Sequence, residues 1–181
     1  VGQHVSCGIK STGTLWCWGF GVADGNNGDS SRFTRSSPLQ IGVATTWRQV
    51  SVGGGLTCAT RTDDSGYCWG NNWDGGIGDG TTNDATSPVA VTGSWERISA
   101  GGASACGIKT DQTLWCWGNN GSGQLGIGST TSAHTPTKVG TDTWTYIAAA
   151  DSNACGIKTD LTLWCWGANW NAQVGNNSYT N

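Results

Sequence analysis

The fold is decided by the stretch Cys106-Gly107-Ile108-Lys109-Thr110-Asp111-Gln112-Thr113-Leu114-Trp115-Cys116-Trp117-Gly118, because it recurs along the chain. Nearly the same residues run from 155 to 167 and from 7 to 19, and a looser copy runs from 58 to 70. The first cysteine of each copy stands at position 7, 58, 106 or 155, so the steps are 51, 48 and 49 residues. A period near 50 residues is typical of propeller blades or a solenoid, in which one repeat cannot bury its apolar face alone.

Two further markers follow the same spacing: Trp47, Trp95 and Trp144, and Pro38, Pro88 and Pro136. The aromatic run at 114–117, ended by Gly118, and the run at 144–149 predict strands, whereas the Gly- and Asn-rich stretch 118–132 is typical of a loop. Because no stretch shows a sustained helical period with caps, we expect very low helix content. We expect a single repeat domain over residues 1–181, with approximate repeats at 1–51, 52–99 and 100–148 and an incomplete one at 149–181.

These markers carry a family resemblance. The markers follow one another in a fixed order: Trp-x-x-Ile/Val, a Gly-rich step, Cys-Gly-Ile-Lys-Thr-Asp, Leu-Trp-Cys-Trp-Gly-Asn-Asn, and Gly-Gln-Leu-Gly at 123–126. This order resembles the regulator of chromosome condensation repeat, in an extracellular, disulfide-containing bacterial-type variant. That family forms a seven-bladed β-propeller with about fifty residues per blade. The resemblance implies an all-β fold of propeller-type blades of about 49 residues, in about four repeats. They would form a closed small ring, a partial ring, or an arc completed by another chain.

One family feature is altered in this sequence. The family usually has glycine in the hairpin after Asp, and here only Gly13 fits, while Gln112 and Leu161 replace it. Because a positive φ suits glycine best, we expect these turns either to be built differently or to tolerate strain.

The eight cysteines form four pairs, each ten residues apart: Cys7 and Cys17, Cys58 and Cys68, Cys106 and Cys116, and Cys155 and Cys165. If the chain turns near Thr12, Asp63, Asp111 and Asp160, the two members of each pair face one another across a hairpin, close enough for a disulfide. Buried free thiols are the alternative. Zinc is less favoured, because there is no C-x2-C and only His4 and His134 could add ligands. Disulfides predict an extracellular or cell-surface location.

Composition excludes several classes of protein. Only 12% of residues are charged, and a net charge of -3 leaves no basic surface for nucleic acid. No apolar run approaches the ~20 residues of a spanning helix. Residues 1–10 do not resemble a signal peptide, and the absence of Met suggests a processed or excised chain.

Neither a catalytic centre nor a cofactor site is predicted. Residues 121–126 spell G-x-G-x-x-G, but the Thr, Ser and Pro that follow do not predict the helix that a dinucleotide site needs. His4 and His134 are isolated, without a nucleophile at a defined spacing. Asp24 with Asp29, and Asp74 with Asp79, lack the calcium-loop pattern and are interpreted as turn residues, so no metal is expected.

Tryptophans provide the candidate binding residues. Those that recur at equivalent positions are predicted to pack in the core or between blades: Trp16, Trp115 and Trp164, and Trp18, Trp69, Trp117 and Trp166. Trp73 and Trp170 instead occupy the same position of a Gly/Asn loop, where they could stack on a sugar ring or a neighbouring protein; local packing under the loop is the alternative. Asn120 and Asn176 begin sequons and are candidate glycosylation sites.

The sequence therefore suggests a non-enzymatic, extracellular structural or interaction module. Its length corresponds to almost four repeats and is short of seven, which predicts an unpaired strand edge. A longer array, two chains completing one ring, or strand exchange in a fibre would cover that edge, and we expect self-association into a larger surface or fibre assembly. A carbohydrate-binding, lectin-like module is the alternative. A guanine-nucleotide exchange regulator, like the family's best-known member, is disfavoured by the acidic balance and the cysteine pairs.

Overall fold

The chain folds into antiparallel β-strands. The structure is a computed structural model that describes residues 1–21 and 25–181. One sheet has the strand order β1-β2-β3, and a second, nine-stranded sheet has the order β12-β11-β10-β9-β8-β7-β6-β5-β4. The described residues include no helix, and therefore none that could cross a membrane. The predicted all-β fold with propeller-type blades is confirmed.

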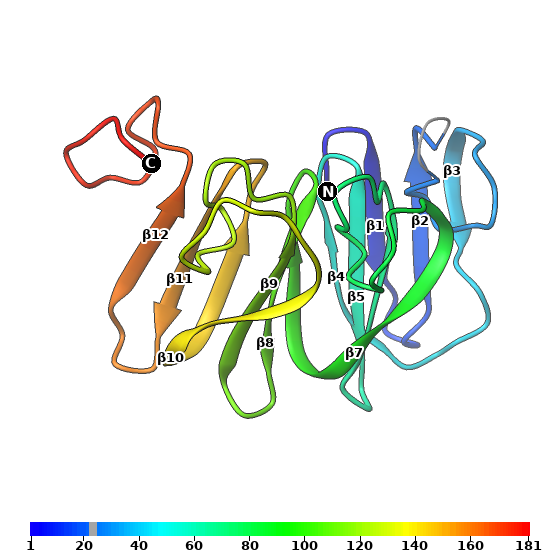
Figure 1. Ribbon diagram of the computed structural model, residues 1–181. Helices are drawn as coiled ribbons and strands as arrows, with labels where there is room; N and C mark the ends of the chain where they lie inside the picture. The colour runs from blue at the N-terminus through cyan, green and yellow to red at the C-terminus, as the bar shows by residue number, and fades with distance from the viewer. Residues whose placement is uncertain (22–24) are drawn as a thin grey trace.

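The strands group into four blades, which stand side by side in an arc (Figure 1). Blade 1 contains β1 (Val5–Ile9), β2 (Leu15–Gly19) and β3 (Arg35–Gln40). Blade 2 contains β4 (Trp47–Val52), β5 (Leu56–Arg61), β6 (Ser65–Gly70) and the first part of β7 (Ala85–Ala100). Blade 3 contains the rest of β7, β8 (Ser104–Lys109), β9 (Thr113–Gly118) and the first part of β10 (Ala133–Ala149). Blade 4 contains the rest of β10, β11 (Asn153–Lys158) and β12 (Leu163–Gly167).

Two long strands each serve two blades. In β7, Val89 pairs with Cys68 of blade 2, whereas Ser99 pairs with Cys106 of blade 3. In the same way β10 pairs with β9 through its first part and with β11 through its second part. The chain therefore passes from the outer edge of one blade to the inner edge of the next without leaving the strand.

The core lies between blades. Each contact between neighbouring blades, which we call a seam, encloses one apolar cluster around tryptophan rings. Trp69 and Trp47 pack in the seam of blades 1 and 2, and Trp117 and Trp95 in the seam of blades 2 and 3. In the seam of blades 3 and 4, Trp144 lies in the cluster and the half-buried Trp166 packs against it. Repeats that cannot bury their own faces are thus joined through these clusters.

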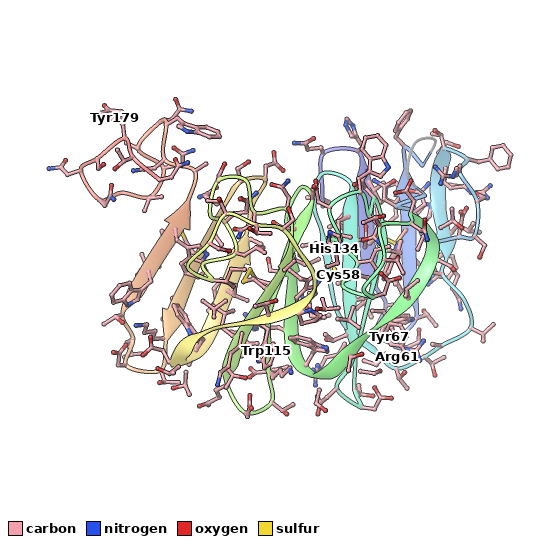
Figure 2. All side chains as sticks on the ribbon, in the orientation of Figure 1. Cys58, Arg61, Tyr67, Trp115, His134 and Tyr179 are labelled. Carbon is pink, nitrogen blue, oxygen red and sulfur yellow. A yellow bond between two sulfur atoms is a disulfide. The ribbon has the colours of Figure 1, made fainter. Side chains whose placement is uncertain are left out.

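Trp115 and Trp164 are the first tryptophans of their Leu-Trp-Cys-Trp runs. Trp115 packs against the apolar cluster between blades 2 and 3, as expected, whereas Trp164 does not pack in a cluster. Trp115 is only half-buried, and Trp164 is 52% exposed. The ammonium of Lys109 lies 3.6 Å from the centroid of the Trp115 ring, and the Arg61 guanidinium covers the ring of Tyr67 in blade 2 (Figure 2). The neighbouring blade buries Trp117 but leaves Trp115 at the rim, where a cation covers it.

Disulfides close the hairpin of every blade. In each case the two cysteines are directly opposite one another in the strand register. The bonds are Cys7–Cys17, Cys58–Cys68, Cys106–Cys116 and Cys155–Cys165, and the described residues contain no free cysteine.

The hairpin turns keep a left-handed residue even where glycine is missing. Gly13 has φ 75°, and the equivalent Asp64, Gln112 and Leu161 have φ 64°, 65° and 69°. Of the two expectations for these turns, strain is therefore the correct one. The preceding aspartate fixes the turn: Asp111 Oδ1 accepts hydrogen bonds from the Thr113 hydroxyl at 2.6 Å and from its backbone N–H at 3.0 Å. These bonds hold the pKa of Asp111 below its usual value.

Candidate interaction surface

A tryptophan seated on a glycine defines each seam. Trp117 of blade 3 donates a hydrogen bond from Nε1 to the carbonyl oxygen of Gly76, in the loop of blade 2, at 2.8 Å. Beneath the ring lies Gly78, with φ 81°, where a Cβ atom would stand 2.7 Å from Nε1. Glycine is required here for two reasons, since the backbone is left-handed and the indole occupies the space of a side chain. We call this arrangement a tryptophan seat.

The same seat recurs in the other two seams. Trp69 donates to the carbonyl oxygen of Asn26 at 3.0 Å above Gly28, and Trp166 donates to that of Gln124 at 2.9 Å above Gly126. The Cβ atoms of these glycines would stand 2.5 Å and 2.8 Å from the nearest indole nitrogen. A recurring carbonyl and a recurring glycine therefore form one half of the seam, and the tryptophan of the following blade forms the other half.

At the two ends of the arc these halves are unmatched. Gly175 of the blade 4 loop corresponds to Gly28, Gly78 and Gly126, has φ 73°, and has no atom within 4 Å of the position of its Cβ. At the other end, Trp18 of blade 1 corresponds to the seated tryptophans. It is half-buried, and within residues 1–21 and 25–181 its Nε1 donates no hydrogen bond. Within the described residues, blade 4 thus has the glycine of a seat without a tryptophan above it, which we call an empty seat. Blade 1 has the tryptophan without a glycine and carbonyl partner.

Blade 4 also exposes apolar side chains. Leu163 and Trp164 of β12 are 68% and 52% exposed, and Tyr146 of β10 is 48% exposed. The equivalent Leu15 and Leu114, in blades 1 and 3, are completely buried. Leu15 and Leu114 each lie in an apolar cluster with the inner-strand tryptophan of the following blade, Trp47 and Trp144, whereas among the described residues no following blade covers Leu163 on the edge strand β12. An edge strand with large exposed side chains is a surface for association.

In blades 2, 3 and 4, the loop that carries the seat is organised by a buried asparagine. Asn120 is fully buried, donates from Nδ2 to the carbonyls of Ser129 and Thr131 at 2.8 Å and 3.0 Å, and accepts from the N–H of Leu125 at 3.0 Å. Asn72 and Asn169 bond in the same way. Asn stands three residues after Trp69, Trp117 and Trp166, and this recurrence is the sequence signal for the role; blade 1 has Gly21 at the equivalent position.

This role corrects one candidate glycosylation site. A glycan on Nδ2 of Asn120 is incompatible with its burial and with two donated hydrogen bonds. Asn176 is exposed, and its Oδ1 accepts hydrogen bonds from the Asn169 side chain and from the N–H of Ser178. A sequon alone does not distinguish these two environments.

The candidate binding tryptophans lie apart from one another. Trp73, in the loop of blade 2, is 74% exposed, and Trp170, in the loop of blade 4, is 61% exposed. Blade 3 stands between them, so the structure does not bring them into one site. Their exposure disagrees with the alternative of local packing under the loop.

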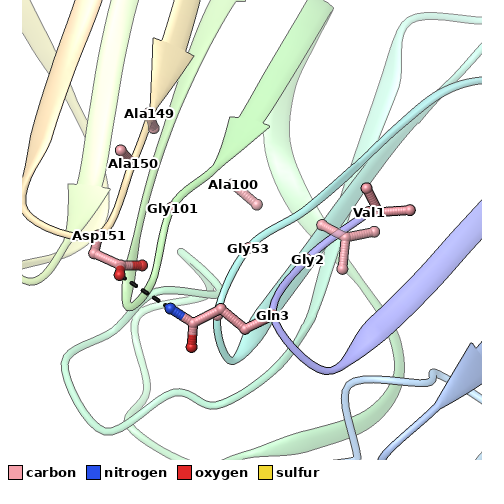
Figure 3. A pocket seen from close by; sticks show the side chains of 11 residues that line it. Val1, Gly2, Gln3, Gly53, Ala100, Gly101, Ala149, Ala150 and Asp151 are labelled. Atoms are coloured by element: carbon pink, nitrogen blue, oxygen red, sulfur yellow. Dashed lines mark hydrogen bonds between the residues drawn. The ribbon is translucent and has the colours of Figure 1, made fainter.

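The inner face of the arc holds a cavity of about 420 Å³ lined mainly by glycine and alanine. Gln3 of blade 1 donates from Nε2 to Asp151 of blade 4 at 3.2 Å across it (Figure 3). The lining offers one carboxylate and no nucleophile–base pair. In the part of the chain that the structure describes, no three His, Cys, Asp or Glu side chains are grouped to hold a metal ion.

The remaining acidic and histidine candidates have local contacts. Asp29 binds Arg35 and Ser31; burial raises its pKa, and these hydrogen bonds lower it by more, so the net shift is downward. Asp79 Oδ1 accepts a hydrogen bond from the N–H of Thr81 at 2.9 Å, which is typical of an aspartate in a turn. His4 stacks at 5.9 Å on Phe20. Asp24 lies outside the described residues.

Comparison with known families identifies the repeat. Family models of the regulator of chromosome condensation (RCC1) repeat match residues 111–157 and 95–124. Residues 95–157 are similar to this repeat. The matched residues include the Cys106–Cys116 hairpin, Trp117, and the carbonyl of Gln124 and Gly126 that receive Trp166.

Several solved structures share the fold. Human WBSCR16 aligns with a TM-score of 0.89 and 20% identity over 100% of this chain and 50% of its own. Yeast RCC1 (Prp20), solved bound to Kap60, aligns with a TM-score of 0.86 and 17% identity over 99% of this chain and 45% of its own. The ectodomain of the Physcomitrella patens receptor kinase CR4 aligns with a TM-score of 0.60 and 20% identity over 98% of this chain and 43% of its own. The chain spans about half the length of these structures.

Proposed function

We propose that this RCC1-repeat chain is a non-enzymatic structural module of the extracellular space, folding as a single repeat domain and acting through association at the ends of its arc. A propeller-type fold supports an interaction module in general terms, because it presents repeated surfaces on a rigid scaffold. The observation that carries the proposal is the unmatched surface of blade 4, where Leu163 and Trp164 are exposed while the equivalent Leu15 and Leu114 are buried.

The extracellular location is supported by the disulfides. Four hairpin bonds persist only in an oxidising compartment. The CR4 structure is described as an ectodomain, so blades of this kind also occur outside the cell. The test is to alkylate the chain at the moment its natural source is opened. We expect no cysteine to be labelled, and labelling of all eight would contradict the location.

Association is tested by sedimentation velocity of the oxidised chain over a wide concentration range. We expect the mean mass to rise with concentration, because the exposed apolar surface becomes buried between chains. A chain that stays monomeric at every concentration would contradict association.

Carbohydrate binding is a second candidate, supported by the exposure of Trp73 and Trp170. An exposed indole on a loop stacks well on the apolar face of a sugar ring. The test is a glycan array with the wild type and the Trp73→Ala, Trp170→Ala variant. We expect binding to fall in the variant, and unchanged binding would exclude both side chains. A glycan on Asn176 is tested separately, by the mass change on enzymatic deglycosylation.

A further inference from the structure

The linker between one blade and the next differs in length between the seams. Between the last apolar residue of the outer strand and the tryptophan of the next inner strand lie residues 92–94, 140–143 or 42–46. Beside the shortest linker, Trp95 donates from Nε1 to the carbonyl of Val91 at 3.2 Å. Trp47 and Trp144, beside the longer linkers, are each 4% exposed, and among the described residues their buried Nε1 atoms have no hydrogen-bond partner. Each lines a cavity, of about 370 Å³ and about 350 Å³ respectively.

A cation lies against two aromatic rings in every seam. The guanidinium of Arg61 lies 4.5 Å from the centroid of the Trp47 ring, and 4.3 Å from that of Tyr67 (Figure 2). Lys109 and Lys158 occupy the equivalent position, each over two tryptophan rings of its own blade. Contact with the rings holds the cation in place, so a ligand in the cavity would meet a positioned positive charge.

In the seam of blades 3 and 4, the linker itself supplies a carboxylate to this cation. Asp142 Oδ2 lies 2.9 Å from Nζ of Lys158, and both residues line the cavity. In the seam of blades 2 and 3, Asp79 lines the same cavity as Lys109. In the seam of blades 1 and 2, linker residues 42–46 include no acidic residue, and none of the described residues that line the cavity is acidic. This cavity therefore has the cation without a carboxylate.

Arg61 has no polar partner in the part of the chain that the structure describes. Its guanidinium makes no hydrogen bond or ion pair there, and its Nε atom is buried. The acidic residues of the adjacent turn are engaged elsewhere, since Asp63 accepts a hydrogen bond from Ser65 and Asp64 pairs with Arg48. A partly buried cation without a partner loses hydration, and a carboxylate ligand would offset that loss.

The rest of the cavity of blades 1 and 2 is apolar or aromatic, and Val43 and Pro88 are among its lining residues. We infer that this cavity binds a small carboxylic acid with an apolar body, whose carboxylate pairs with Arg61 as Asp142 pairs with Lys158, and that Asp142 blocks the equivalent cavity of blades 3 and 4. Its volume of about 370 Å³ is within the range of small-molecule sites.

The test is isothermal titration of the oxidised chain with phenylacetate, and with phenylacetamide, which has nearly the same shape without the charge. We expect one phenylacetate to bind per chain and phenylacetamide to bind at least about tenfold more weakly, because a charge-assisted hydrogen bond is lost. Failure of phenylacetate to bind, or equal affinity for the two compounds, overturns the inference. The site lies away from the exposed surface of blade 4, so this result does not depend on association.

Variants of the cavity assign the binding to Arg61. Arg61→Met keeps the length of the side chain without the charge and is expected to weaken phenylacetate binding at least about tenfold. Ala44→Asp places a carboxylate in the linker, as Asp142 does, and is expected to weaken binding similarly. Lys109→Met is the matched control and should leave the affinity unchanged. Intact disulfides and an unchanged near-UV circular dichroism spectrum establish folding. Wild-type affinity in both Arg61→Met and Ala44→Asp overturns the site.

The converse variant tests the role of the linker carboxylate. Asp142→Ala leaves Lys158 without its partner, so we expect a second phenylacetate to bind per chain. The double variant Asp142→Ala, Lys158→Met should return the stoichiometry to one. A stoichiometry that stays at one in Asp142→Ala overturns the inferred block by Asp142.

Discussion

Gly78 lies directly beneath the indole of Trp117, with its Cβ position 2.7 Å from Nε1. The two residues belong to different blades, so this one contact sets how closely blade 3 approaches blade 2. Gly78→Ala is expected to destabilise the chain by about 1–3 kcal/mol, because a methyl group overpacks the seam and the residue has φ 81°. The midpoint of urea unfolding measures the loss. Gly42→Ala, with similar φ and open space, should lose less, and an equal loss in both variants would assign the effect to the backbone alone.

Leu161 shows the opposite situation, a large side chain at φ 69° with 82% exposure. Leu161→Gly is expected to raise the free energy of unfolding by roughly 0.5–1 kcal/mol, because glycine adopts the left-handed region without the steric cost of Cβ. Thermal unfolding measures the gain. Leu161→Ala removes the same exposed side chain but retains Cβ, so a gain of equal size in that variant would show that the turn is not strained.

Acid is expected to weaken the hairpins. The hydroxyls and N–H groups of Ser65, Thr113 and Thr162 hold the pKa values of Asp63, Asp111 and Asp160 below the ordinary 3.8. A carboxyl whose folded pKa is depressed stabilises the fold above its unfolded pKa and loses that contribution as the pH falls through the folded pKa. Stability should therefore be constant above about pH 5 and fall below about pH 4.

The variant Asp111→Asn, Asp160→Asn keeps the acceptor oxygen without the titration. Its melting temperature should fall less than that of the wild type between pH 6 and pH 2.5. Parallel curves for the two proteins would show that the acid loss arises elsewhere.

The disulfides are expected to contribute measurably to stability. Cys106 and Cys116 close a hairpin at the centre of the arc, and the double change to Ala should cost about 3 kcal/mol in the chain-entropy model of a short loop. Urea unfolding measures this cost. Cys155 and Cys165 lie in the end blade, so their removal should reveal a separate, earlier transition of blade 4, whereas a single shifted transition would show that the blades unfold together.

The hairpins could be predicted from the sequence because their determinants are local. Cys106 and Cys116 are ten residues apart around one turn, and the repeat presents the same spacing again. The sharing of β7 by two blades could not be predicted in this way. Residues 92–94, which separate its two parts, include Gly93, and nothing local distinguishes a continuous strand from a loop there.

Burial was predicted less well than strand position. Trp115 and Trp117 share one face of β9, and alternation does not reveal that Trp117 is completely buried whereas Trp115 is half-buried at the edge of the same cluster. In the same way the sequon at Asn120 gives no sign that its amide is used inside the loop. The seats were detectable in principle, since Gly28, Gly78, Gly126 and Gly175 recur at the spacing of the repeat. The role of these glycines becomes clear only from the structure, which places the tryptophan of the following blade above three of them.

The shared strands β7 and β10 determine how a tensile load would pass along the arc. Force applied at blade 2 and blade 4 would pass between blades through covalent backbone that is hydrogen-bonded into a sheet on each side. Separating blades 2 and 3 would mean stripping β7 from β6 or from β8, where the hydrogen bonds lie in ladders along the strand. The joints of blades 2 and 3 and of blades 3 and 4 therefore have no hinge, and the compliance of the arc resides at the joint of blades 1 and 2, where residues 41–46 connect strands of two separate sheets.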